Sequence, residues 1–254
     1  MSEYVTLTLR SPLEESVGLE SVVPDRFATS SEIEIARLPV WAGRSQRAIG
    51  DYFDVRGDRS AIVRIVGDVR HAHGMGAAMT AGFIDVLGSV GNDTGVGMVG
   101  GAIHVRGDAG HRIGAGLPGA SRGMTGGEIV VDGSVGDDAG TRMRRGLLFV
   151  GGNTGNAPAR DIIAGTLLVM GRVGGEPALG SKRGTLVAGG EIDVPVTYRH
   201  ACRYRPPHVQ LALTYLMRRF GISVDARFVT GTYDRYCGDA GTVSRGEILR
   251  WSHE

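Results

Sequence analysis

The sequence predicts an all-β protein, a right-handed single-stranded parallel β-helix with 19-residue coils, followed by a C-terminal helix. Three observations predict this class. Glycine accounts for 42 of the 254 residues, about twice its ordinary share. One glycine-bounded pattern recurs with a fixed period, which is typical of repeat architectures. Within each repeat, aliphatic residues alternate with period 2, as they do in a strand with one buried face.

The repeated pattern reads G-x-[aliphatic]-x-[small aliphatic]-x-G. Its first glycine stands at positions 82, 101, 127, 146, 165 and 184, so the successive intervals are 19, 26, 19, 19 and 19. We place the seven extra residues of the long interval around 116–122. A weaker unit, residues 62–67, precedes the first full one. The spacing therefore predicts six or seven stacked coils, each carrying one short strand.

Aligning the repeats produces columns of similar residues that we expect to point inward. Two aliphatic columns come from the strand, a third follows the next corner, and a fourth is mostly methionine, which adapts to irregular space. These columns are Ile84, Ile103, Ile129, Leu148, Leu167 and Leu186; Val86, Val105, Val131, Val150, Val169 and Ala188; Val90, Ala109, Val135, Thr154 and Val173; and Met79, Met98, Met124, Met143 and Ile162.

Two related architectures do not fit the period. The left-handed hexapeptide helix needs an aliphatic residue every six positions, and 19 is not a multiple of six. The calcium-binding nonapeptide array needs stacked aspartates, but Asp93, Asp108 and Asp137 recur only loosely. We expect right-handed coiling because parallel crossovers almost always take that hand.

The ends of the coil need caps, which predicts three parts: 1–58, an N-terminal capping segment; 59–197, the β-helix; and 198–254, a C-terminal helix and tail packed on its end. The first part holds a strand-like alternation over 5–9, and Ile33 and Ile35 before Trp41.

The C-terminal part begins with a predicted helix, 209–220, that Gly221 closes. Its apolar positions 209, 212, 213, 216 and 220 form one stripe,. Ile222 and Val224 suggest a further strand-like piece, and a glycine-rich tail ends at Trp251.

Composition excludes several classes of function. A net charge of +1 favours neither nucleic acid nor an anionic membrane as a partner. The first residues lack the pattern of a secretory signal, and the apolar runs are too short to cross a bilayer. Cys202 and Cys237 are the two cysteines, and without a CxxC pair they predict no metal site. We expect a cytoplasmic protein with reduced thiols.

The sequence offers no recognisable catalytic centre. It contains neither GxSxG nor a Walker A motif. His71 and His73 lack a third ligand at a sensible spacing, which argues against a metal site there,. Residues 95–100 match GxGxxG by letter, but they lie inside a glycine-periodic coil rather than between a strand and a helix,. We therefore predict no catalytic residue and no metal ligand in this chain.

The outward position of the strand becomes apolar along the row, where it holds Phe149, Leu168 and Val187. Such a face is normally covered. We predict a partner interface at these three residues; cover by the chain's own C-terminal helix is the alternative.

Basic residues recur on successive coils in the second half of the repeat. They are Arg142, Arg144, Arg145, Arg160, Arg172 and Arg183, with Lys182 beside the last of them. An ordinary charged face explains them, but so does a ridge that binds a polyanionic chain, because the guanidinium group pairs with carboxylates through two parallel hydrogen bonds.

Several stretches resemble a known family. They are residues 50–57 (GDYFDVRG), the G-x-I-x-V-x-G coils with G-x-x-M, and residues 143–155 (MRRGLLFVGGNTG). Together they resemble the C subunit of formylmethanofuran dehydrogenase. The tail, with RYCGD at 235–239 and RGEIL at 245–249, is similar to the bacterial branch, the C subunit of the formyltransferase/hydrolase complex of methylotrophs. The coil pattern by itself also resembles the C-terminal domain of the glutamate synthase large subunit.

The resemblance implies a scaffold subunit without an active site of its own. Its partners would be a formyltransferase subunit, an amidohydrolase-like metal subunit and a further subunit. Together they convert formyl-tetrahydromethanopterin to formate via formyl-methylofuran. The polyglutamate tail of methylofuran is the polyanion that the arginine ridge would guide.

Three alternatives stay open. The chain could be the C subunit of a molybdenum or tungsten formylmethanofuran dehydrogenase, a stand-alone binding module related to the glutamate synthase domain, or a β-helix enzyme in its own right.

Overall fold

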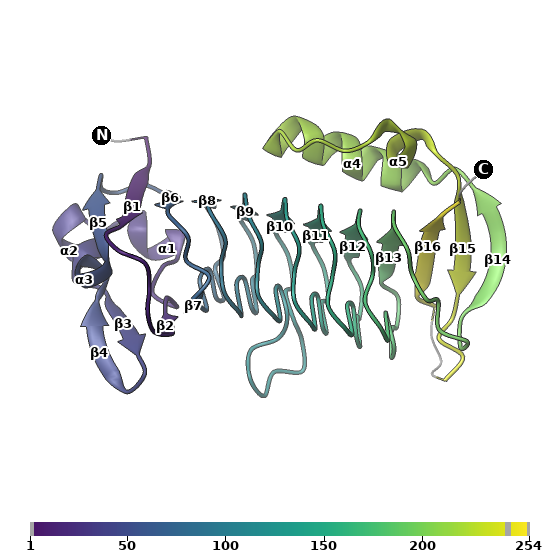
Figure 1. Cartoon of the computed structure of the whole chain (residues 1–254), viewed down its shortest axis with the longest axis horizontal. Coiled ribbons are helices and arrows are strands. Elements are labelled where there is room, and N and C mark those ends of the chain that lie inside the picture. The colour runs from purple at the N-terminus through teal and green to yellow at the C-terminus, as the bar shows by residue number, and fades with distance from the viewer. Residues whose placement is uncertain (1–2, 242–244, 253–254) are drawn as a thin grey trace.

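The computed structural model describes residues 3–241 and 245–252. It is mostly β-sheet with a few short helices, so the all-β prediction is confirmed. The repeating strands stand side by side in one row (Figure 1). They are β6 (Ile62–Val66), β8 (Phe83–Leu87), β9 (Ala102–Val105), β10 (Glu128–Val131), β11 (Leu147–Val150), β12 (Thr166–Val169) and β13 (Thr185–Ala188).

Neighbouring strands of the row are parallel, and their register reproduces the period of the sequence. Phe83 of β8 pairs with Ala102 of β9, one full period later. The step from β9 to β10 is longer, because Ala102 pairs with Glu128. The steps to β11, β12 and β13 each return to the 19-residue period. The seven extra residues belong to the loop that projects from the row between β9 and β10 (Figure 1).

The four predicted columns form the interior. Every residue in them is 8% exposed or less. A second line of parallel bridges joins Val69, Val90, Ala109, Val135 and Thr154, one repeat after another. Each repeat therefore contacts the next both at its strand and at a corner, and the inward positions become continuous stacks of like side chains.

Polar side chains at the corners bind the backbone of the following repeat. The Ser134 amide donates to the Asp108 carboxylate (2.7 Å), and the Asn153 amide donates to the Ser134 hydroxyl (3.0 Å). The Arg172 amide then donates to the Asn153 side chain (2.8 Å). These bonds satisfy amides that no strand pairs, so Asp108 has a structural role at its corner.

Glycine is required where two repeats approach most closely. A Cβ atom at Gly174 would lie inside van der Waals distance of the Gly155 carbonyl oxygen, whereas at Gly175 the nearest atom would be the Asn156 side-chain oxygen at 3.1 Å. We expect Gly174→Ala to lower the free energy of unfolding by about 3 kcal/mol, because backbone must move to relieve the overlap. The adjacent Gly175→Ala should cost under about 1 kcal/mol. Urea denaturation of both variants tests this difference, and equal losses would contradict it.

The N-terminal segment extends the same sheet. β1 (Val5–Leu9) pairs in parallel with β6 and antiparallel with β5 (Phe53–Arg56). A second sheet joins β4 (Ser45–Ala48), β3 (Pro39–Ala42), β2 (Val17–Gly18) and β7 (Ala72–His73), in that order. Three short helices lie nearby: α1 (Pro24–Phe27), α2 (Glu32–Ala36) and α3 (Ile49–Tyr52). Ile33 and Ile35 belong to α2, which Ser31 and Glu34 cap reciprocally,.

The C-terminal segment caps the other end and turns back over the row. The predicted helix is α4 (Pro207–Phe220), which ends at Gly221 with φ +69°. A short helix, α5 (Ala226–Thr230), follows. The strands β14 (Arg199–Tyr204), β15 (Tyr233–Cys237) and β16 (Glu247–Trp251) continue the sheet, and β16 pairs in parallel with β13. The whole sheet has 12 strands and is mixed at both ends.

The strand-like piece predicted at Ile222 and Val224 is wrong. Residues 221–225 are neither helix nor strand. Ile222 and Val224 pack into the apolar cluster under α4, so their alternation reflects contact with that cluster and not a place in a sheet. The division at residues 58 and 197 stays a prediction, since both end segments share the sheet of the repeats.

A second apolar core separates α4 from the outward face of the sheet. Val209, Leu213, Leu216 and Phe220 of α4 form one buried stripe, as the spacing of the sequence predicts. Figure 1 shows α4 lying along the row of strands. The helix covers the apolar part of the face. At its last residue, Phe220, the outward side chains become polar, because Phe220 contacts His104. On the strand beyond, Asp85 pairs with Arg64 and Arg106.

Candidate functional site

A groove with a basic lining runs across three repeats. Its volume is about 670 Å³, and it is lined by Ser121, Arg122, Arg144, Arg145, Ile163, Ala164, Lys182 and Arg183. The lining holds five cationic side chains and no carboxylate. Among residues 3–241 and 245–252, no carboxylate forms an ion pair with Arg122, Arg144, Arg145 or Arg183. The lining is therefore suited to an anion with several negative groups.

The 19-residue period positions these side chains. Arg144, Ile163 and Lys182 occupy equivalent positions of three repeats, each directly after the fourth inward column. Their amides donate to the carbonyls of Met124, Met143 and Ile162, one repeat back, at 2.8 Å in all three cases. Neighbouring strands lie about 4.8 Å apart. The two basic corners, 144–145 and 182–183, are thus about 10 Å apart, with Ile163 and Ala164 between them.

The loop inserted between β9 and β10 supplies one end of the groove. Ser121 and Arg122 are the residues of this loop that line the groove. The loop is held by a hydrogen bond that the Arg142 guanidinium donates to the Ala120 carbonyl (3.2 Å). Arg122 is a lining residue that the sequence prediction missed, because it lies outside the repeating positions.

The six arginines predicted as one ridge lie in three places. Arg144, Arg145 and Arg183 line the groove. Arg142 and Arg160 line a separate pocket of about 450 Å³ on the other side of the inserted loop. There Arg142 faces Asp161 (Nε–Oδ2 3.8 Å) and Arg160 pairs with Glu176 (3.0 Å). Arg172 lies at a corner outside both. The structure therefore brings together three of the six with Lys182, which the sequence places beside Arg183, and adds Arg122.

The three residues predicted as a partner interface lie under the chain's own helix. Phe149 is 1% exposed, and Leu168 and Val187 are fully buried. All three belong to the cluster that includes the buried stripe of α4. In the structure these three side chains are covered by the chain's own helix, which is the alternative that the sequence leaves open. On the outer face of α4, Leu211 and Tyr215 are exposed.

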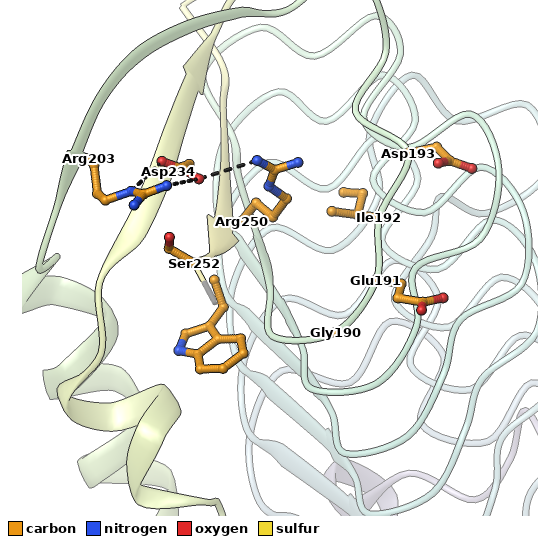
Figure 2. Close-up of a pocket in the computed structure, with 9 residues that line it drawn as sticks. Gly190, Glu191, Ile192, Asp193, Arg203, Asp234, Arg250 and Ser252 are labelled. Atoms are coloured by element: carbon orange, nitrogen blue, oxygen red, sulfur yellow. Dashed lines mark hydrogen bonds and ion pairs between the residues drawn. The ribbon is translucent and has the colours of Figure 1, made fainter. Parts of the chain in front are cut away.

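Another pocket, of about 470 Å³, opens at the C-terminal end of the sheet (Figure 2). Asp234 lies between Arg203 (2.8 and 3.1 Å) and Arg250 (3.2 Å), and the His200 ring is 3.4 Å away. Hydrogen bonds from Arg203 lower the pKa of Asp234 to about 2. Because the two guanidinium groups already pair with this carboxylate, the pocket offers less positive charge to a ligand than the groove does.

The depressed pKa of Asp234 predicts an acid-sensitive C-terminal end. A carboxyl group whose pKa is lower in the folded state stabilises the fold above its unfolded pKa, here 3.8,. That stability is lost as the pH falls from about 4 toward 2. We expect Asp234→Asn to cost up to about 2 kcal/mol at pH 7 and much less at pH 2. Chemical denaturation at both pH values measures the difference, and an equal cost at both would contradict the assignment.

The described ranges hold neither a cluster of metal ligands nor a membrane-spanning helix. Within the described ranges, no three His, Cys, Asp or Glu side chains gather as metal ligands would. No helix of those ranges has the length and apolar character that crossing a membrane requires.

Comparisons with known proteins identify relatives. No family model matches the chain. It is 30% identical over 92 residues to the C subunit of molybdenum-containing formylmethanofuran dehydrogenase 1 from Methanosarcina barkeri, covering 34% of this chain and 31% of the relative. It is 35% identical over 86 residues to the C subunit of the formyltransferase/hydrolase complex Fhc from Methylorubrum extorquens, covering 34% and 32%. These matches span about a third of the curated relatives' length.

A solved structure extends the likeness to the whole chain. A chain in the crystal structure of the Methylorubrum extorquens formyltransferase/hydrolase complex with methylofuran matches with a TM-score of 0.79 and 32% identity. The match covers 98% of this chain and 100% of that one. The repeated all-β fold is thus that of a subunit in a multi-subunit formyltransferase/hydrolase complex. The chain belongs to the C-subunit family of the formyltransferase/hydrolase complex and formylmethanofuran dehydrogenase.

Proposed function

We propose that the chain is the scaffold C subunit of a formyltransferase/hydrolase complex that acts in the cytoplasm. Its partners are a formyltransferase subunit, an amidohydrolase-like metal subunit and a further subunit. The complex converts formyl-tetrahydromethanopterin to formate via formyl-methylofuran. The observation that carries the proposal is the end-to-end match to a chain of such a complex.

We further propose that the row of repeats is a right-handed single-stranded parallel β-helix. The constant 19-residue register, the parallel pairing of successive strands and the second line of corner bridges support it. The right-handed preference of parallel crossovers supplies the hand. Backbone bonds and stacked side chains between all repeats would give a rigid rod, which suits a subunit that holds others at fixed positions.

The basic groove is the part of the chain that we assign to methylofuran. Its polyglutamate tail carries a row of carboxylates, and the groove presents two basic corners about 10 Å apart with no competing carboxylate in its lining. In an extended peptide, residues three apart are also about 10 Å apart. The backbone of four or more glutamates would therefore span the distance from Arg144 and Arg145 at one end to Lys182 and Arg183 at the other. The groove would bind and orient this tail, while the chemistry takes place on the other subunits.

Purification from the native host tests the proposal. We expect a mildly affinity-purified chain to bring a formyltransferase and an amidohydrolase-like chain in fixed ratio, and the preparation to release formate from formyl-tetrahydromethanopterin. Mass spectrometry and a formate assay are the readouts. A chain that is recovered alone would refute the proposal.

The same purification decides the alternative. The match to the molybdenum enzyme of Methanosarcina barkeri favours the C subunit of a formylmethanofuran dehydrogenase as the second candidate. In that case molybdopterin or iron–sulfur subunits would be recovered with the chain. A stand-alone module related to the glutamate synthase domain would be recovered without either set.

A further inference from the structure

The loop inserted between β9 and β10 projects from the row of repeats (Figure 1) but closes on itself. Its residues are 116–122. The two ends touch, because a Cβ atom at Gly116 would lie 2.8 Å from the Arg122 carbonyl oxygen. Leu117 contacts the row at Gly97, where an added Cβ would lie 3.1 Å from the Leu117 Cγ atom. The loop is therefore a compact element with a defined path, as short loops with adjoining ends are.

One residue of the next repeat, Arg142, holds this loop at two points. Its guanidinium group donates a hydrogen bond to the Ala120 carbonyl (3.2 Å). Its own carbonyl accepts from the amide of Gly123, the residue directly after the loop (2.7 Å). The first bond depends on the arginine side chain, and the second is made by the backbone alone. A substitution at Arg142 therefore releases the body of the loop while the end of the loop stays attached.

The loop forms a wall between the two basic pockets of the chain. Residues 116–120 line the pocket that holds Arg142 and Arg160, whereas Ser121 and Arg122 line the groove. Arg122 is exposed, and no carboxylate in the described part of the chain forms an ion pair with it. Its guanidinium group is thus available to a carboxylate of a ligand in the groove.

Arg122 makes the row of cations in the groove longer by one repeat. The bond between Gly123 and Arg142 joins neighbouring repeats, so Arg122 stands one step of about 4.8 Å before the corner at 144–145. The corner at 182–183 lies two steps beyond. The whole row is therefore about 14 Å long, against about 10 Å for the two corners alone. An extended peptide spans the longer distance with about five residues and the shorter one with about four.

We propose that Arg122 determines how long a stretch of an acidic peptide chain the groove engages, and that Arg142 is a positioning residue that acts through it. The two corners engage a stretch of four acidic residues, and the inserted loop extends that stretch to five. The inference rests on the proposed function, because it uses the assignment of the groove to a polyglutamate tail. Its signature is a dependence of the affinity on chain length.

Binding of two peptides of different length to the full chain tests the role of Arg122. Fluorescence anisotropy at low ionic strength measures the affinity for labelled tetraglutamate and hexaglutamate. Arg122→Gln should weaken hexaglutamate binding about two- to fivefold, the effect of one exposed charge-assisted contact. It should weaken tetraglutamate binding less than about twofold. Arg122→Lys keeps the charge and should keep the length dependence. Equal losses for both peptides overturn the proposal, since they would show a general effect of net charge.

A double-mutant cycle tests whether Arg142 acts through Arg122. Arg142→Gln should weaken hexaglutamate binding by about as much as Arg122→Gln does, and should add less than about 1.5-fold when Arg122→Gln is already present. The matched control is Arg160→Gln, because Arg160 lines the same pocket as Arg142 but pairs with Glu176 (3.0 Å). This control should change the affinity less than about 1.5-fold in either background. Additive losses from Arg122→Gln and Arg142→Gln would remove the positioning role.

The outcome for the proposed function can be told apart from the outcome for this inference. If the loss of Arg144, Arg145 and Arg183 leaves hexaglutamate binding unchanged, the assignment of the groove fails and this inference fails with it. If those three arginines are needed but Arg122→Gln alters the affinity for neither peptide, the groove keeps its assignment and only the inference is overturned.

Discussion

The variant Arg144→Gln/Arg145→Gln/Arg183→Gln should bind a fluorescein-labelled hexaglutamate about 10–100-fold more weakly than the wild-type chain does. Each substitution removes a cation that is partly screened by water but has no carboxylate partner in the described ranges. We therefore assign about 0.5–1 kcal/mol to each lost charge-assisted contact. Fluorescence anisotropy at low ionic strength measures the affinity. Binding by the wild type should weaken as salt is added, because exposed charges are screened within a few ångströms at high salt.

The control uses two arginines from the same sequence-predicted ridge. Arg160→Gln/Arg172→Gln removes two positive charges outside the groove, because Arg160 lines the other pocket and pairs with Glu176 and Arg172 lies at a corner. We expect a change of about twofold or less, since only the long-range field is altered. Equal losses in the two variants would show that net charge, and not the groove, determines binding.

The assembled complex gives the functional readout. If the groove guides the polyglutamate tail, the triple variant should lower coupled formate production from formyl-tetrahydromethanopterin. An unchanged rate with an intact complex would remove the groove from the mechanism.

The interior of the repeats was predictable because each inward residue has the same surroundings in every repeat. Ile103 and Leu148, for example, lie in one stack, so the period of the sequence alone placed both in the core. The corner bonds were not predictable. Asp108 and Asn153 differ in chemistry, yet both accept from the backbone of the next repeat, so no constant residue type marks that column.

The basic groove was half predictable. Repeat position separates the arginines: Arg144 and Arg145 directly follow the fourth inward column, as Lys182 and Arg183 do two repeats later, whereas Arg142 and Arg160 precede it. Grouping the basic residues by their position within the repeat therefore predicts the two basic corners, 144–145 and 182–183. Arg122 could not be found in this way, because the path of the inserted loop is set by contacts such as that between Arg142 and Ala120 and not by the period.

The sequence of the strands does not show which element covers their outward face. Phe149 and Leu168 show that something must cover them, but they do not show whether a helix of this chain or a partner does so. The apolar stripe of α4 matches the face in chemistry, and only the path of residues 198–206 brings the two together.

Truncation of Leu168 therefore gives the largest expected loss of stability. Leu168 lies at the centre of the face under α4, between Phe149 and Val187 on the neighbouring strands, and it is fully buried. Leu168→Ala leaves a cavity between sheet and helix, which should cost about 2–5 kcal/mol. For a chain of this size each kcal/mol lowers the Tm by about 2–4 °C, so we expect a decrease of roughly 5–15 °C. Thermal denaturation of the isolated chain measures it.

The matched control lies on the opposite side of the same helix. Leu211 is 71% exposed, so Leu211→Ala should change the stability by about 0.5 kcal/mol or less. Hydrogen exchange adds a local readout, because loss of packing under α4 should speed exchange of the helix amides more than those of β10–β12. Since α4 belongs to this chain, both effects must appear with no partner present. A loss of stability that appears only within the complex would mean that a partner, and not α4, covers this face in solution.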